Sequence, residues 1–217
     1  MKSLLIFDLD GTLLDTVADL AASTNHALRL CGFPVHESEA FRFFVGNGIN
    51  KLFERALPEG EKTQENILNV RRYFLEYYGT HNADLTTPYP GIVSLLLSLQ
   101  NAGIKLAVAS NKYQKGTEKL IQHFFPEINF VAVFGQREDI PAKPDPTIVY
   151  DILAIANVEK QEALYIGDSG VDMQTAQNSG LEAAGVTWGF RPRAEMEQFS
   201  PVYMVDDPSE ILSIAIQ

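Results

Sequence analysis

The sequence has a single cysteine, Cys31, among its 217 residues, and therefore no intramolecular disulfide can form. It also lacks Cys or His pairs at the spacing of zinc ligands. Disulfide-stapled domains and zinc modules are excluded. A protein with so little cysteine is expected in the reducing cytoplasm.

Positive charge and long apolar runs are also scarce. The sequence has only 17 Lys and Arg residues but 28 Asp and Glu residues, which gives a net charge of −11 and an isoelectric point near 4.8. Nucleic-acid binding needs clustered cations, so we expect no nucleic-acid partner. Asp8 and Asp10 interrupt the first apolar run, and no uncharged run reaches the roughly 18 residues of a membrane span. We therefore expect a soluble protein without membrane contact.

Short apolar runs dominate the rest of the chain. Residues 4–9 form a nearly continuous apolar run, typical of a central parallel strand that is covered on both faces. Similar runs alternate with helix-periodic segments; they lie at residues 104–109, 130–134, 163–166, 183–187 and 202–205. This alternation predicts an α/β fold with a parallel-sheet core and helices on both faces.

Residues 16–82 break this alternation. Their apolar side chains recur at helical spacing, and no strand pattern intervenes. We expect a small all-helical cap domain here, and an α/β core made of residues 1–15 and 83–217. The turn-forming residues 82–91 would serve as the second hinge.

Two acidic residues stand where the first strand ends, in the peptide Asp8-Leu9-Asp10-Gly11-Thr12. Carboxylates separated by one residue can both enter a pocket if the backbone turns at Gly11. In open α/β sheets, ligands bind beyond the carboxyl ends of the strands. From these residues alone, a polar strand end with an Asp-Gly turn is the alternative.

Four segments together resemble the motifs of the haloacid dehalogenase superfamily, in the order in which that family has them. They are the acidic peptide above, Ser110-Asn111-Lys112, Lys143-Pro144-Asp145-Pro146 and Gly167-Asp168-Ser169-Gly170-Val171-Asp172. Each stands beside a predicted strand or helix start. The resemblance spans residues 8–172 and implies a Rossmann-like core with a helical cap inserted after the first motif.

The resemblance implies a Mg²⁺-dependent phosphatase that acts on a small phosphorylated metabolite. Asp8 would be the nucleophile that forms a phospho-aspartate, and Asp10 the general acid and base. Asp8, the backbone carbonyl of Asp10, and Asp168 would hold the metal. The chemistry agrees, because a carboxylate can attack a phosphomonoester dianion only if positive groups neutralise its approach, and Mg²⁺ prefers oxygen ligands.

Further roles follow from the same resemblance. Ser110, Asn111 and Lys143 would bind the phosphate, and Lys143 would also pair with the nucleophile. Asp172 would contact metal-bound waters or Lys143, although an acidic residue that stabilises the start of a helix is the alternative. Thr12 would orient the first motif through hydrogen bonds.

The predicted cap contains Gly46-Asn47-Gly48, which resembles a loop of phosphoglycolate phosphatases. Glycines at this point would let backbone N–H groups approach an anionic substrate. A tight turn between helices is the alternative. The likeness favours 2-phosphoglycolate as substrate.

Other functions stay open at this stage. Asp10 argues against dehalogenation, since dehalogenases of the family lack this second acid. A β-phosphoglucomutase-like isomerase and a pyrophosphatase share the core motifs. A non-catalytic binding protein is disfavoured because the acidic and basic motif residues are intact. The chain is expected to be a monomer or a homodimer.

Overall fold

The computed structural model describes residues 1–217 and has a six-stranded parallel sheet at its centre. The strand order is β5-β4-β1-β6-β7-β8, and every neighbouring pair is parallel. The strands are β1 (Leu4–Phe7), β4 (Lys105–Tyr113), β5 (Phe130–Gln136), β6 (Ala163–Gly167), β7 (Glu182–Val186) and β8 (Tyr203–Val205). This architecture confirms the predicted α/β fold.

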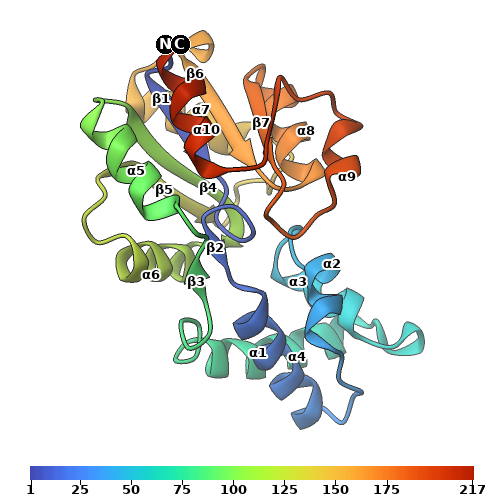
Figure 1. Ribbon diagram of the computed structural model, residues 1–217. Helices are drawn as coiled ribbons and strands as arrows, with labels where there is room; N and C mark the ends of the chain where they lie inside the picture. Colours follow the sequence, from blue (N-terminus) through green and yellow to red (C-terminus); the bar gives the residue numbers. More distant parts are fainter.

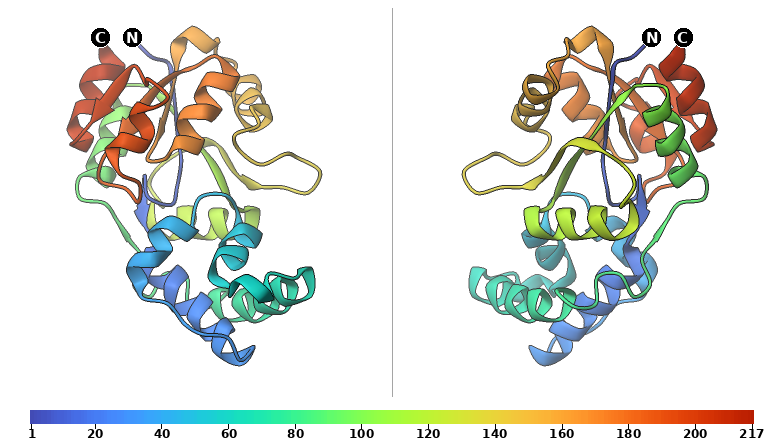
Figure 2. Two further views of the ribbon diagram at one scale, coloured as in Figure 1. Left: turned by 90° about the vertical axis from the view of Figure 1, so that its right-hand side faces the viewer. Right: turned by 90° about the vertical axis from the view of Figure 1, so that its left-hand side faces the viewer.

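Helices cover both faces of the sheet (Figure 2). Successive side chains of β1 point to opposite faces, so Leu5 and Phe7 join one hydrophobic cluster, while Leu4 and Ile6 join another. The first cluster includes α5 (Ile92–Asn101), α6 (Gln114–Phe124) and α10 (Pro208–Ile216). The second includes α7 (Thr147–Ala156), α8 (Gly170–Ser179) and α9 (Arg193–Glu197). Burial on both faces explains why β1 is apolar throughout.

Strand β4 extends further than the apolar pattern predicts. The apolar run stops at Ala109, but the strand continues to Tyr113, with an irregular register against β5 over its last residues. Ser110, Asn111 and Lys112 therefore belong to the strand itself and are buried. The hydrophobic pattern predicts too early an end for this strand, because its last residues are polar. Their side chains are nevertheless buried, since they form hydrogen bonds inside the protein.

The segment between β1 and α5 forms a separate helical unit, drawn below the sheet in Figure 1. Its elements are α1 (Val17–Leu30), η1 (Ser38–Ala40), α2 (Phe41–Phe44), α3 (Ile49–Ala56), η2 (Glu59–Glu61) and α4 (Gln64–Tyr78). They enclose their own hydrophobic cluster, which Phe190 of the core joins. The helical pattern predicted for residues 16–82 agrees with these elements. No helix of the structure has the length and apolarity needed to cross a membrane.

Two short strands connect this unit to the sheet. Strand β2 (Leu14–Asp15) pairs antiparallel with β3 (Thr87–Pro88). Beside them, the buried Asp19 carboxylate accepts hydrogen bonds from Leu85 N (3.0 Å), Thr86 N (2.8 Å) and Thr86 Oγ1 (2.7 Å). Both connections are thus tied together at the base of the helical unit.

Candidate active site

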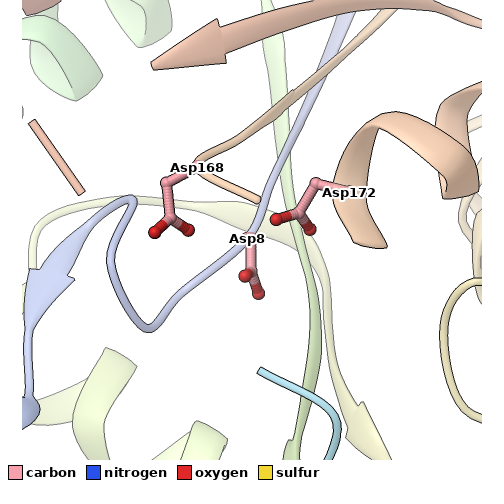
Figure 3. A group of neighbouring side chains, drawn as sticks. All are labelled: Asp8, Asp168 and Asp172. Carbon is pink, nitrogen blue, oxygen red and sulfur yellow. The ribbon is translucent and has the colours of Figure 1, made fainter. Parts of the chain in front are cut away.

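Three buried carboxylates converge at one edge of the sheet. Asp8 follows β1, Asp168 follows β6, and Asp172 lies in the first turn of α8. Their nearest oxygens all lie within 4.8 Å of one another (Figure 3). β1 and β6 are parallel neighbours, so their carboxyl ends meet at the same edge, as the motif positions predicted.

Lys143 lies between two of these carboxylates. Its Nζ is 2.7 Å from Asp172 Oδ1 and 3.0 Å from Asp8 Oδ1, and it donates to Ala109 O at 2.8 Å and to Tyr165 Oη at 3.0 Å. Burial by itself would lower the pKa of Lys143. The carboxylates of Asp172 and Asp8 outweigh that effect and hold this pKa well above its usual range. The ammonium group is therefore permanently charged beside the predicted nucleophile.

The carboxyl groups nevertheless carry more negative charge than the lysines offset. Burial, together with the neighbouring carboxylate of Asp172, raises the pKa of Asp8 to about 7, against the pull of Lys143. Burial and the carboxylates of Asp172 and Asp8 raise the pKa of Asp168 well above its usual range. A bound cation would favour the ionised forms of Asp8 and Asp168.

The donor set fits a divalent metal ion such as Mg²⁺. Asp8 Oδ1 is buried and, although close to Lys143, meets no donor at hydrogen-bond geometry. The candidate ligand atoms of Asp8, Asp168 and Asp172 are hard carboxylate oxygens, the type that Mg²⁺ prefers. The acidic groups of Asp8, Asp10, Asp168 and Asp172 outnumber the two ammonium groups, those of Lys112 and Lys143, so acidic oxygens are in excess at the place where a divalent ion would bind.

The loop after β7 holds Asp168 in place. Phe190 N donates to Asp168 Oδ2 at 2.7 Å, and Thr12 Oγ1 reaches Asp168 Oδ1 at 3.3 Å. A Cβ atom at Gly189 would overlap the Asp168 side chain and the carbonyl oxygen of Gly11. Thr12 was predicted to orient the first motif, but its hydroxyl contacts Asp168 of the fourth motif. The sequence did not predict the contacts of Gly189 and Phe190 with Asp168. The one signal in the sequence is Gly189 after Trp188, since a glycine allows another segment to pack closely against the backbone.

Asp10 lies apart from the carboxylate trio and has partners of its own. Thr16 Oγ1 donates to Asp10 Oδ1 at 2.7 Å, and Lys112 Nζ lies 3.1 Å and 3.3 Å from its two oxygens. The sequence does not predict this contact of Lys112 with Asp10, which lies 102 positions away. The position of Lys112 after Ser110 and Asn111 in the second motif was the available signal.

Asn111 connects three segments. Its Oδ1 accepts from Lys143 N at 2.8 Å, and its Nδ2 donates to Lys143 O at 3.0 Å and to Gly46 O at 3.1 Å. These bonds occupy both Nδ2 hydrogens, so a bound phosphate would meet the backbone of Asn111. Ser110 Oγ accepts from Lys112 N at 3.2 Å and lines the pocket, where its own proton is available.

The glycine loop of the helical unit approaches this edge of the sheet. Gly46 and Gly48 line the pocket with positive φ angles of 116° and 84°. Asn47 does not line it, since its Oδ1 accepts from Arg55 Nη2 at 2.6 Å. Arg191 of the core donates to Val45 O at 3.0 Å and so fastens the loop over the site.

The pocket is a narrow cavity of about 50 Å³ between the sheet and the helical unit. Its polar side consists of Asp8, Asp10, Ser110, Asn111 and Lys112. The rest of the lining is mainly apolar and includes Leu20, Val45, Ile49, Leu52, Phe74, Tyr78 and Tyr113, together with Gly46 and Gly48. Such a site can hold a small anion beside a carboxylate nucleophile and exclude water from it.

Comparisons with known proteins agree with this geometry. Residues 5–186 match the family described as haloacid dehalogenase-like hydrolase. The phosphoglycolate phosphatase of Psychrobacter arcticus is 33% identical over 222 residues, which cover 100% of this chain and 96% of that protein. The phosphoglycolate phosphatase of Vibrio cholerae is 32% identical and covers 100% and 99%.

A solved structure gives the same indication. The crystal structure of a protein described as a candidate phosphoglycolate phosphatase from Lactobacillus delbrueckii subsp. bulgaricus superimposes with a TM-score of 0.91. The two chains are 31% identical, and the match covers 99% of each. The helical unit is included in that coverage.

Proposed function

Since the chain belongs to the haloacid dehalogenase-like hydrolases and is a phosphoric monoester hydrolase, we propose that it hydrolyses 2-phosphoglycolate through a phospho-aspartate on Asp8. The observation that carries this proposal is the placement of Asp8 within 3.0 Å of the Lys143 ammonium and beside Asp168. The names of the full-length relatives support the substrate. The helical unit would act as the cap.

In the first half-reaction, an Asp8 oxygen attacks phosphorus while the bond to the ester oxygen breaks. Asp10, on the pocket side, gives its proton to the departing glycolate oxygen. The Ser110 hydroxyl and the backbone of Asn111 would hold phosphoryl oxygens. Lys143 would join them by exchanging one of its three acceptors, which are Ala109 O, Tyr165 Oη and Asp172 Oδ1, for a phosphoryl oxygen. The closed helical unit would keep water out during this step.

In the second half-reaction, Asp10 takes a proton from a water that attacks the phospho-aspartate. Inorganic phosphate leaves, and the Asp8 carboxylate is restored. A Mg²⁺ ion held by Asp8, the Asp10 carbonyl and Asp168 would supply charge neutralisation for the approach of the two anions. Asp172 would keep Lys143 oriented, since the two groups are 2.7 Å apart.

We also propose that the protein is cytoplasmic and that it is a monomer or a homodimer. A cytoplasmic location is supported by the single, unpaired Cys31. A monomer or a homodimer is proposed because the pocket is complete within one chain.

The test is phosphate release from 2-phosphoglycolate, hexose 1- and 6-phosphates, pyrophosphate and nucleotides, with Mg²⁺ and again with EDTA. We expect a sharp, Mg²⁺-dependent preference for 2-phosphoglycolate. Interconversion of hexose phosphates without phosphate release would favour the β-phosphoglucomutase-like alternative, and a preference for pyrophosphate would favour a pyrophosphatase.

The nucleophile is tested with Asp8→Asn. We expect turnover to fall by at least about a thousandfold, because the covalent path disappears. Asp139→Asn is the matched control, since Asp139 is exposed and far from the pocket lining. Wild-type turnover by a folded, metal-loaded Asp8→Asn protein would refute the mechanism.

A further inference from the structure

The apolar side of the pocket contains one polar atom without a partner. Tyr78 is fully buried at the end of α4, and its hydroxyl makes no hydrogen bond. The residue lines the pocket, and its ring stacks on Phe74 with centroids 4.9 Å apart. A buried hydroxyl without a partner costs stability, and an acceptor atom on a ligand bound in the pocket would supply that partner.

The only cation that lines the pocket lies next to this residue. Lys112 Nζ is 4.8 Å from the centre of the Tyr78 ring, and its side chain is only 4% exposed. Its one hydrogen-bonding partner is the Asp10 carboxylate. An ammonium group has three N–H donors, so Lys112 can hold Asp10 and still bind a second anion.

We propose that Lys112 and Tyr78 form a carboxylate subsite that selects substrates with a carboxylate on the carbon next to the phosphoester oxygen. The inference rests on the proposed function and deepens it, because it names the residues that would recognise the glycolate part. The phosphate end of the substrate is left to Lys143, Ser110 and the metal, on the sheet side of the cavity.

Lys112 lies close enough to Asp10 to contact the carboxylate of a bound substrate. A general acid must come within about 3 Å of the ester oxygen that it protonates. A carboxylate on the adjacent carbon lies about 3 Å from that oxygen, which is within hydrogen-bond reach of a donor beside Asp10. Lys112 Nζ, 3.1 Å from Asp10 Oδ1, is such a donor.

The surroundings strengthen the interaction. Leu20, Leu52 and Phe74 line the same side of the cavity, so little water competes for the anion. Burial, with the nearby Asp10 carboxylate, raises the pKa of Tyr78 well above its usual range, and its hydroxyl stays protonated as a donor. A neutral CH₂OH group in place of the carboxylate would offer the Lys112 ammonium no second anion beside Asp10.

The test compares two substrates that differ only in this group, 2-phosphoglycolate and 2-hydroxyethyl phosphate, with full-length protein and Mg²⁺. The readout is the ratio of their kcat/KM values. We expect Lys112→Met to lower this ratio roughly 10- to 100-fold and Tyr78→Phe to lower it about 10-fold, as for the loss of hydrogen bonds to a charged group. The ratio separates recognition from any shared effect on Asp10.

Tyr78→Phe and a control variant, Lys115→Met, cover the case in which Lys112→Met does not fold. Tyr78→Phe removes a single atom that has no partner, so it should fold even if Lys112→Met does not. Lys115→Met makes the same chemical change at an exposed position and should keep the wild-type ratio. A ratio within about twofold of wild type in both pocket variants would overturn the subsite alone. Failure of the wild-type protein to hydrolyse 2-phosphoglycolate would overturn the proposed function together with it.

Discussion

Replacing Lys143 by Met should destabilise the protein strongly, and by an amount that depends on pH. The Lys143 side chain is 1% exposed, and its ammonium is the one group of opposite charge within 3.0 Å of both Asp8 and Asp172. Breaking a buried ion pair by removing one partner costs about 3–5 kcal/mol, because a buried charge is left without compensation. This is a large part of the roughly 5–15 kcal/mol free energy of unfolding of ordinary domains.

The loss should be larger at pH 7.5 than at pH 5. The pKa of Asp8 is already raised to about 7 in the folded protein, and removal of the neighbouring ammonium raises it further. The folded variant then holds a proton at Asp8 that the unfolded chain, with an ordinary pKa near 4, releases. Such a group stabilises the folded state at low pH, and this stabilisation is lost as the pH rises through the folded pKa.

The assay is urea denaturation in EDTA at both pH values, followed by the fluorescence of Trp188, which donates to Thr12 O near the site. Lys62→Met is the matched control, because it breaks a solvent-exposed pair with Glu59 and should cost less than about 1 kcal/mol. A loss for Lys143→Met below about 1 kcal/mol, or an equal loss at both pH values, would refute the reasoning.

Three more results are expected. Gly189→Ala should lower turnover at least about a hundredfold, measured by phosphate release, because the added methyl group displaces Asp168. Arg191→Ala should raise KM about five- to tenfold with a smaller change in kcat, because the loop loses the hydrogen bond at Val45 that fastens it. Mg²⁺ should raise the melting temperature more at pH 8 than at pH 5, because the metal must displace the proton that Asp8 holds up to about pH 7.

Each of these has its own control. Gly60→Ala adds a methyl group where no atom lies within 4 Å, and should leave turnover unaltered. Arg193→Ala removes only exposed ion pairs, and a KM as high as that of Arg191→Ala would contradict the fastening role. Asp8→Asn removes one of the two acidic groups with raised pKa values that compete with the metal for protons, the other being Asp168, so the pH dependence of its response to Mg²⁺ should become smaller. An unchanged pH dependence would contradict the role given to Asp8.

The site residues that directly follow a strand can be predicted from the sequence. Asp8 stands directly after an apolar strand, and Asp168 and Asp172 stand after another. Parallel strands bring their carboxyl ends to one edge, so strand patterning alone predicts that these carboxylates are neighbours. The family resemblance drawn from the four motifs is confirmed by the match over residues 5–186.

Residues whose role depends on packing between distant segments were missed. Lys112 meets Asp10 across 102 positions of the chain, and Phe190 meets Asp168 across 22. Asn47 was expected at the substrate, but Arg55 holds its side chain elsewhere. A motif shows which residue types occur together, whereas the rotamer and partner of a long side chain depend on neighbours that only folding supplies.

The sequence by itself determined the order of strands and helices, the polar strand ends and the helical character of residues 16–82, since these follow from periodicity over adjacent residues. Only the tertiary structure decided how the helical unit lies against the sheet, and therefore which side chains enclose the cavity. Lys112 and Tyr78 come from β4 and α4, which are separated by the whole return connection, and their proximity depends on how the helical unit packs against the sheet.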